Sequence, residues 1–209
     1  MTLERLHLVT HTEASHHVDG LVGGWFDSEL TPHGQQQATR IAEVLAERIG
    51  SGPVGVHSSD LARARQTAAP IADRLDVEVL TDARLRERSF GEAEGRPQQW
   101  LRERAIPVPE GADLLTHHDG PAGAETRGQL AQRLYAVLHE ILAEPREHLV
   151  IVSHGSATSY LILAWLGVPV AAAGRGFFRL DSGSITTLAP SPAHQSHNVL
   201  TVNETVSSE

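Results

Sequence analysis

The sequence predicts an α/β fold, a three-layer αβα sandwich with a mostly parallel central sheet. Two observations support this class. Short apolar runs alternate along the chain with longer segments whose apolar residues recur at helical spacing. The run at 149–153 is apolar almost throughout, which is typical of a central strand covered on both faces.

The first part of the chain alternates strands with helices. A helix should begin after Thr31, because threonine can cap it and Pro32 suits the first helical position. Gly50 should end this helix, and a second helix is expected over 60–75. The predicted strands of this part cover residues 6–10, 54–58 and 77–80.

The second part is less regular. Prolines and glycines interrupt 84–123, where only a short helix near 97–104 is expected. Strong helices follow at 125–144 and 155–166. The predicted strands are 149–153, a hairpin of 177–180 with 184–188, and an edge strand at 199–202.

The chain is predicted to form one domain over 1–209. No repeat or linker divides it, and 209 residues suffice for a sizeable core. Residues 14–30 suit an active-site loop, 93–123 a lid or insertion, and 204–209 a frayed polar tail.

Composition narrows the classes of partner and compartment. A net charge of −9 argues against nucleic acid, but a local cationic pocket can still bind a small phosphorylated substrate. No signal peptide and no apolar run long enough to span a bilayer are visible, so no membrane partner is expected. The absence of cysteine permits a cytoplasmic location, which we expect. A homodimer is an open possibility on statistical grounds.

Two histidines stand directly after apolar strands. His11 follows the run at 6–10 and His154 follows the run at 149–153, while Arg63 lies in the block 58–68 between them. Parallel strands deliver the residues at their carboxyl ends to one edge of the sheet. Two imidazoles and a guanidinium gathered there would form a site for a phosphoryl group.

These blocks resemble the histidine phosphatase superfamily, which includes cofactor-dependent phosphoglycerate mutases and many small phosphatases. Five blocks match in order over nearly the whole chain, and together they are specific. They are Leu8 to Glu13, Asp27 to Ala38, Ser58 to Ala68, Leu85 to Glu87 with Gly91, and Ser153 to Gly155. The resemblance implies a phosphoglycerate mutase-like fold and no cofactor or metal.

The resemblance also assigns roles. His11 would attack phosphorus and form a phosphohistidine, and Glu87 would move the proton of the leaving oxygen and then of water. Arg63 would hold two phosphoryl oxygens in a fork, and His154 would stabilise their charge. The N–H groups near Gly155 and Ser156, at a helix start, would add to this.

The chain departs from the family pattern beside the nucleophile. Family members have Arg before the first histidine and Gly after it, whereas this chain has Thr10 and Thr12. The usual Asn six residues after the nucleophile is His17. Our hypothesis is that His17, Arg86 or Arg88 replaces part of the missing charge. Thr10, Thr12 and His17 are therefore counted among the phosphate-binding residues.

The sequence favours a phosphomonoesterase acting on a small phosphorylated metabolite. Only 67 residues separate Glu87 from His154, fewer than in mutases of the family, and an open site admits water. Two alternatives stay open: a binding member that has lost hydrolysis, and an atypical isomerase or lyase. A metal site at His11, His16 and His17 is least favoured, because their spacing lacks a closed ligand set.

Overall fold

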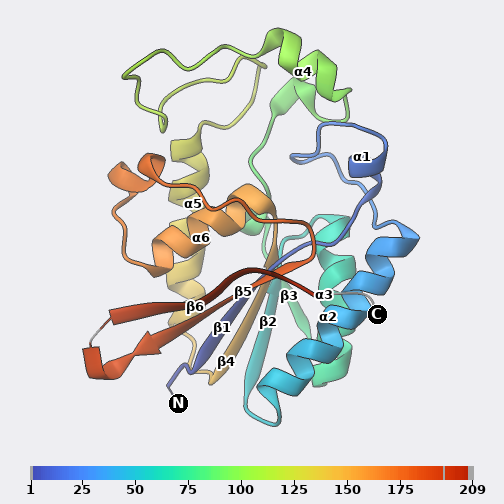
Figure 1. The fold of residues 1–209 in the computed structure, drawn as a ribbon, viewed down its shortest axis with the longest axis vertical. Coiled ribbons are helices and arrows are strands. Elements are labelled where there is room, and N and C mark those ends of the chain that lie inside the picture. The colour runs from blue at the N-terminus through green and yellow to red at the C-terminus, as the bar shows by residue number, and fades with distance from the viewer. Residues whose placement is uncertain (1, 195, 207–209) are drawn as a thin grey trace.

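The central sheet has six strands in the order β3-β2-β4-β1-β5-β6 (Figure 1). The computed structural model describes residues 2–194 and 196–206. Strands β1 to β4 are mutually parallel, whereas β5 and β6 run antiparallel to their neighbours. The strands are β1 (Arg5–Thr10), β2 (Val54–Ser58), β3 (Val79–Thr81), β4 (His148–Ser153), β5 (Ser184–Ser191) and β6 (Ser196–Thr205). The predicted α/β class and mostly parallel sheet are confirmed.

Helices cover both faces of the sheet (Figure 1). Helices α2 (Pro32–Ile49) and α3 (Ala62–Leu75) pack on one face, and α5 (Arg127–Leu142) and α6 (Gly155–Trp165) on the other. The short helices α1 (Ser15–Val18) and α4 (Gln98–Arg104) lie beyond the carboxyl ends of the parallel strands. The remaining helical turns are 3-10 segments: Ala83–Leu85, Gly91–Ala93, Val170–Arg175 and Pro192–His194.

The core consists of two apolar layers separated by the sheet. Strand β1 shows why: Leu6 and Leu8 point into the layer with α5 and α6, while Val9 points into the layer with α2 and α3. Alternate side chains of a strand face opposite sides, so one buried strand supports both layers. The parallel strands are therefore held firmly, and their carboxyl ends form a fixed edge.

Local signals set the ends of α2 as predicted. The Thr31 side chain accepts a hydrogen bond from the Gly34 backbone at 3.0 Å, and Pro32 is the first helical residue. Gly50 ends the helix with a φ of 66°, which glycine adopts without strain. Most other boundaries fall within two residues of expectation.

The predicted hairpin at 177–180 is wrong. Residues 177–180 form no strand, and β5 pairs instead with β1 and β6. Both edges of β5 are thus already occupied. The segment runs over the sheet edge, where the Phe178 backbone N–H donates to Ser159 Oγ at 2.8 Å and Leu180 lines a cavity.

The last strand is longer than predicted and includes the first two residues of the predicted frayed tail. Strand β6 runs to Thr205, and Glu204 pairs both with Ile185 in the sheet and with Arg48 of α2. Residues 207–209 of the predicted tail lie outside the described residues. None of the helices in the described part of the chain has the length and apolar character needed to cross a bilayer.

Candidate active site

The predicted site residues meet at the carboxyl edge of the sheet, around one cavity of about 520 Å³. Strands β1 and β4 run side by side, so His11 and His154 leave the sheet next to each other. Arg63 comes from the first turn of α3, which follows β2. The predicted residues that line the cavity are Thr10, His11, His17, Arg63, Glu87, Gly155 and Ser156. Thr12 and His154 lie directly behind His11.

The nucleophile candidate His11 is held in one tautomer. Its Nδ1 donates to the Thr12 carbonyl at 2.8 Å, and its Nε2 accepts from Arg63 Nε at 3.1 Å. Burial, and then the Arg63 and His17 charges, hold the pKa of His11 well below 6.5. The ring is therefore neutral at pH 7, with a lone pair on Nε2.

His154 stands edge-on to His11, with the ring centroids 5.0 Å apart. Its Nε2 lies 2.9 Å from Ser59 Oγ, while its buried Nδ1 has no hydrogen-bond partner among the described residues. Burial is the main cause that lowers the pKa of His154 well below 6.5, followed by the Arg63 charge. An unpartnered buried nitrogen is costly, so a ligand that bonded to it would gain free energy.

Arg63 is fully buried and engaged by backbone. Nη1 donates to the Phe26 carbonyl and Nη2 to the Gly24 carbonyl, each at 2.7 Å. Burial lowers its pKa to about 10, so it stays a cation at pH 7. The loop around Gly24 thus uses one proton of each Nη, and Nε–H donates to His11. Only the second proton of Nη1 and of Nη2 remains for an oxyanion, and the predicted fork toward phosphate would have to use these two.

The two threonines beside His11 differ in place. Thr10 lines the cavity, and its buried Oγ1 has no hydrogen-bond partner in the described residues. Thr12 faces away, with its N–H 3.2 Å from Thr67 Oγ1 and its carbonyl on His11. Thr10 therefore borders the cavity, whereas the Thr12 carbonyl fixes the orientation of the His11 ring.

The backbone carbonyls of Thr10 and His11 are bound by the turn that contains Gly183. Its N–H lies 3.1 Å from the carbonyls of both Thr10 and His11, and its φ is 75°. Ser182 Oγ donates to the His11 carbonyl at 2.8 Å. The turn before β5 thus fixes the strand end that carries His11.

Glu87 lies across the cavity, on a segment outside the sheet. Its Oε1 accepts from the Arg88 backbone at 2.7 Å and its Oε2 from the Ser156 backbone at 3.0 Å. The second bond ties Glu87 to the start of α6, next to His154. The carboxylate is therefore positioned at the cavity wall where a leaving oxygen or a water would stand.

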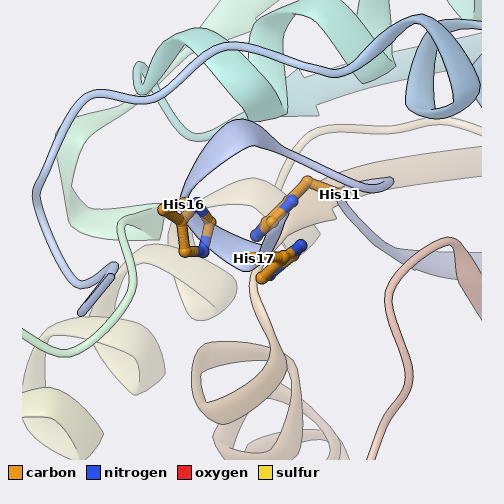
Figure 2. A group of neighbouring side chains, drawn as sticks. All are labelled: His11, His16 and His17. Atoms are coloured by element: carbon orange, nitrogen blue, oxygen red, sulfur yellow. The ribbon is translucent and has the colours of Figure 1, made fainter. Parts of the chain in front are cut away.

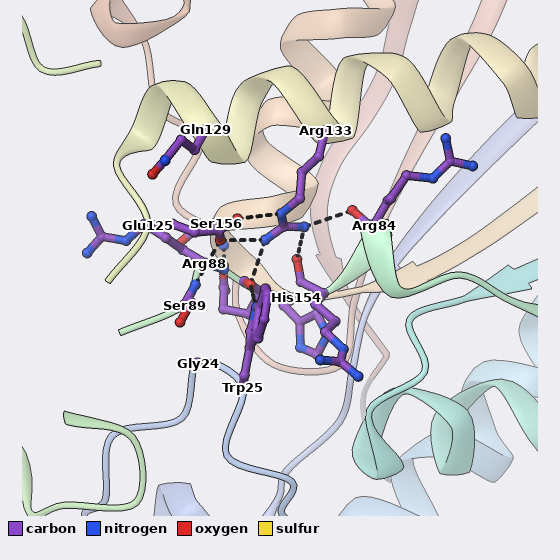
Figure 3. Close-up of polar contacts among 12 residues, drawn as sticks. Gly24, Trp25, Arg84, Arg88, Ser89, Glu125, Gln129, Arg133, His154 and Ser156 are labelled. Carbon is purple, nitrogen blue, oxygen red and sulfur yellow. Dashed lines mark hydrogen bonds and ion pairs between the residues drawn. The ribbon is translucent and has the colours of Figure 1, made fainter. Parts of the chain in front are cut away.

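Arg133, on α5, holds this segment in place, and sequence reasoning missed it (Figure 3). Its guanidinium donates at 2.7 Å to the carbonyls of Arg84, Arg86 and Glu87. It also pairs with Glu125 at 2.8 Å. Nothing near Arg133 in sequence signals this role, because the carbonyls that it holds lie more than forty residues upstream.

Of the three residues proposed to substitute for the missing arginine, two are engaged elsewhere in the structure. Arg86 pairs with Asp60 at 2.6 Å and lies over the Trp25 ring, and Arg88 pairs with Asp119 and lies over Phe90. His17 instead lines the cavity and stacks on His11, with centroids 5.4 Å apart. Of the three candidates in our hypothesis, only His17 faces the nucleophile.

The three clustered histidines offer nitrogen atoms within 4.8 Å of one another (Figure 2). His17 Nδ1, however, accepts from the Ala14 backbone at 3.2 Å, and His11 Nε2 accepts from Arg63. Two of the three rings thus use a lone pair within the protein, and the Arg63 cation repels a metal ion. The same tautomer leaves a proton on His17 Nε2. This donor chemistry fits an anion rather than a metal.

His16 completes the cluster. Its Nδ1 lies 2.6 Å from Ser28 Oγ, and burial lowers its pKa to about 3, with His17 and Arg63 adding to the shift. The pKa of His17 is also lowered, first by burial and then by Arg63. Both rings are neutral at pH 7, and the arginines that line the cavity are Arg63 and Arg179.

Sequence reasoning did not assign several other residues that line the cavity. Among them are Gln98, Phe177, Arg179 and Ser182. Gln98 reaches the cavity from α4, where its side chain donates to the Leu21 carbonyl at 3.0 Å. The other three come from the segment that was predicted to be a hairpin, so the wrong secondary structure concealed their place.

The chain belongs to the histidine phosphatase superfamily, branch 1, whose family model matches residues 6–205. The resemblance expected from the five blocks is therefore confirmed. The match includes all the strands of the sheet and every predicted site residue.

Among curated proteins, the chain is 33% identical to a glucosyl-3-phosphoglycerate phosphatase of Mycolicibacterium vanbaalenii, over 81% of this chain and 77% of that protein. It is also 33% identical to a probable phosphoglycerate mutase GpmB of Klebsiella pneumoniae, over 87% and 83% of the two chains. The relatives thus include proteins named as phosphatases and as mutases.

Solved structures agree with this family. A mycobacterial glucosyl-3-phosphoglycerate phosphatase in complex with VO3 superposes with a TM-score of 0.79 at 28% identity, over 97% of this chain and 100% of that one. A putative alpha-ribazole-5'-P phosphatase from Escherichia coli gives 0.77 at 25% identity, over the whole of both chains. The phosphoglycerate mutase-like fold is thereby confirmed.

Proposed function

We propose that this protein is a phosphomonoesterase that hydrolyses a small phosphorylated metabolite through a phosphohistidine. His11 Nε2 attacks phosphorus, the P–O bond to the alcohol breaks, and Glu87 gives its proton to the leaving oxygen. Water then attacks the phosphohistidine, Glu87 takes a proton from it, and His11 and inorganic phosphate are released. Atoms and charges balance with Glu87 returned to its starting form.

The observation that carries this proposal is the state of His11. It is neutral, its proton is held on Nδ1 by the Thr12 carbonyl, and its lone pair points at a buried guanidinium in a cavity. A neutral imidazole beside a cation is suited to attack an anionic electrophile. The Thr10 hydroxyl and His154 Nδ1, both buried without partners in the described residues, are donors that a bound phosphoryl group would satisfy.

His17 supplies part of what the missing arginine would have provided. With Nδ1 accepting from the Ala14 backbone, its Nε2 proton is free to bond to a phosphoryl oxygen beside His11. A dianionic phosphate would also favour protonation of this ring, which would then add a full charge.

Hydrolysis is favoured over return transfer. Glu87 and His154 are only 67 positions apart in the sequence, and the cavity opens between α1, α4 and the 177–180 segment, so water can reach His11. Names of relatives support a phosphatase, with glucosyl-3-phosphoglycerate phosphatases among them. Phosphorylated small metabolites are therefore the substrates to screen first.

The experiment that tests the proposal is trapping of the phosphoenzyme. The protein is mixed with a panel of 32P-labelled phosphomonoesters and quenched, and the label on protein is measured. We expect an acid-labile, base-stable label that His11→Ala removes, together with phosphate release. His33→Ala, at an exposed position on α2, is the matched control and should keep both the label and the phosphate release. No label and no phosphate release over the panel would contradict the proposal.

One observation favours a second candidate, a phosphate-binding member without hydrolysis. Thr10 occupies the place of an arginine, and Arg63 already bonds to two backbone carbonyls, so transition-state charge has fewer donors. Calorimetry would show phosphate binding with no turnover in that case. The atypical isomerase or lyase alternative would appear as substrate loss without phosphate release.

Three narrower expectations belong to the same proposal. Activity should not require a metal, supported by the donor character of the cluster, and should survive a chelator. The lack of cysteine supports a cytoplasmic location, which fractionation of cells would test. A homodimer would be detected by light scattering with size-exclusion chromatography.

A further inference from the structure

A second cavity, of about 260 Å³, opens beside the catalytic one. It is lined by Arg88, Arg127, Leu130, Ser156, Tyr160 and Phe177, and we refer to it as the side cavity. Ser156 and Phe177 line both cavities, so the two are neighbours across this pair. Since the Ser156 N–H bonds to Glu87, the side cavity begins where a leaving alcohol would stand.

Arg127 is the uncompensated charge of the side cavity. Arg88 is paired with Asp119, and the nearby Glu125 is paired with Arg133. Arg127 makes no ion pair with any described residue, although it is only partly exposed at the start of α5. The side cavity therefore carries about one net positive charge.

Tyr160 is a second, independent sign of a polar ligand. The residue is 2% exposed and lines the side cavity, and its hydroxyl forms no hydrogen bond within the described part of the chain; this oxygen is not among the fully buried atoms, so it is open to the cavity. Burial raises the pKa of Tyr160, and the charges of Arg127 and Arg88, which line the same cavity, oppose the rise. A buried phenol normally finds a partner, so the free hydroxyl indicates a site for an acceptor.

The size and walls of the side cavity define the rest of the ligand. A cavity of about 150 Å³ is enough for a benzene ring in a protein interior. Leu130 and Phe177 offer apolar surface beside the two polar groups. A single cation with one hydroxyl matches a monoanionic carboxylate better than a dianionic phosphate.

We propose that the side cavity binds the alcohol part of the substrate and selects phosphomonoesters whose alcohol carries a ring-sized group with a carboxylate. Arg127 forms the ion pair with that carboxylate, and the Tyr160 hydroxyl donates a hydrogen bond to it. These residues determine specificity and take no part in bond breaking. This inference rests on the proposed phosphomonoesterase activity for its meaning, but its binding component is independent of turnover.

The test uses two esters of nearly the same shape, 4-carboxyphenyl phosphate and 4-carbamoylphenyl phosphate. For the wild type we expect kcat/KM to be about tenfold higher for the carboxylate, the usual scale of a charge-assisted contact. Arg127→Gln should bring this ratio to about one, and Tyr160→Phe should lower it roughly threefold. The control Arg74→Gln, an exposed arginine at the far end of α3, should keep the wild-type ratio.

Dissociation constants of both esters for His11→Ala, measured by calorimetry, separate the two proposals. Hydrolysis of both esters with a wild-type ratio near one, or an Arg127→Gln ratio equal to that of wild type, overturns the side-cavity inference and leaves the phosphatase proposal intact. Absence of hydrolysis together with carboxylate-selective binding that Arg127→Gln removes overturns the phosphatase proposal and supports the side cavity. Absence of both hydrolysis and carboxylate-selective binding overturns the phosphatase proposal and the side-cavity inference together.

Discussion

The floor of the catalytic cavity and its wall are held in place by different means. The floor consists of Thr10, His11 and His154 at strand ends, with Arg63 beside them. Backbone bonds fix it: the His11 N–H donates to the Ser153 carbonyl at 2.9 Å, and the Gly183 N–H closes the other side. The wall is the segment 84–90, which carries Glu87 and belongs to no strand. Side chains fix it, with Arg133 foremost.

This difference separates geometry that comes with the fold from geometry that a few residues add. A strand end cannot move without breaking the ladder on both sides. A segment tied to one guanidinium can move when that guanidinium is lost. Floor substitutions should therefore affect chemistry with little change in fold, while wall substitutions should affect both.

The largest expected effect is on the floor. Arg63→Met removes the cation beside His11, and we expect kcat to fall about a thousandfold, the scale of losing a main oxyanion donor. Arg65→Met, two residues along the same helix and exposed, is the matched control. The measurement is steady-state phosphate release. A loss smaller than tenfold would show that Arg63 acts mainly on the loop around Gly24.

The next effect is on the wall. Arg133→Met removes the ion-pair partner of Glu125 and one hydrogen bond from each of three carbonyls, so the free energy of unfolding should fall by about 3 kcal/mol. Displacement of Glu87 by about 1 Å should also lower kcat roughly a hundredfold. Urea unfolding and phosphate release measure the two effects.

Arg40→Met is the control for this wall variant, because it breaks an exposed ion pair with Glu43 and should cost less than about 1 kcal/mol. Full stability of Arg133→Met would mean that Trp25, whose Nε1 donates to the Glu87 carbonyl at 2.7 Å, is sufficient to hold the wall.

The same contrast explains how much the sequence could predict. His11 and His154 were found because a polar residue after an apolar run must lie at the edge of a parallel sheet, and Arg63 was found because the block 58–68 matches the family pattern. Arg133 was missed because its partners are backbone carbonyls, which have no sequence signature. The carbonyls of Gly24 and Phe26 on Arg63 escaped notice for the same reason. The loop segment 177–180 was mistaken for a strand because the turn-like residues 181–183 separate it from β5, although both edges of β5 are already paired.

A smaller effect is expected from restoring the family residue at the floor. Thr10→Arg adds a guanidinium to the cavity, and inorganic phosphate should bind about tenfold more tightly. His17→Asn should weaken phosphate binding in the Thr10 protein and have less effect in Thr10→Arg, because the new charge replaces the His17 contribution. Calorimetry on the four proteins gives the coupling between the two positions. Equal effects of His17→Asn on phosphate binding in both backgrounds would show that His17 does not replace the missing arginine.

The smallest effect concerns the central sheet beneath the cavity floor. Burial, then the charges of Arg48 and His148, lower the pKa of His7 in β1 to about 4. Between pH 6.5 and 4 the unfolded chain binds a proton at this residue and the folded chain does not, so stability falls as pH falls. His7 should account for about 1 kcal/mol of the unfolding free energy lost between pH 7.5 and 5.5.

His7→Leu should reduce that loss by the same amount, measured by urea unfolding at the two pH values. His33→Leu, at an exposed position on α2, should leave the loss unchanged. If His7→Leu kept the full acid sensitivity, the sensitivity would come from His11, His16 and His154 in the site. The stability of the sheet would then depend on the protonation of the site histidines. The contrast between floor and wall would have to include the ionisation of these histidines.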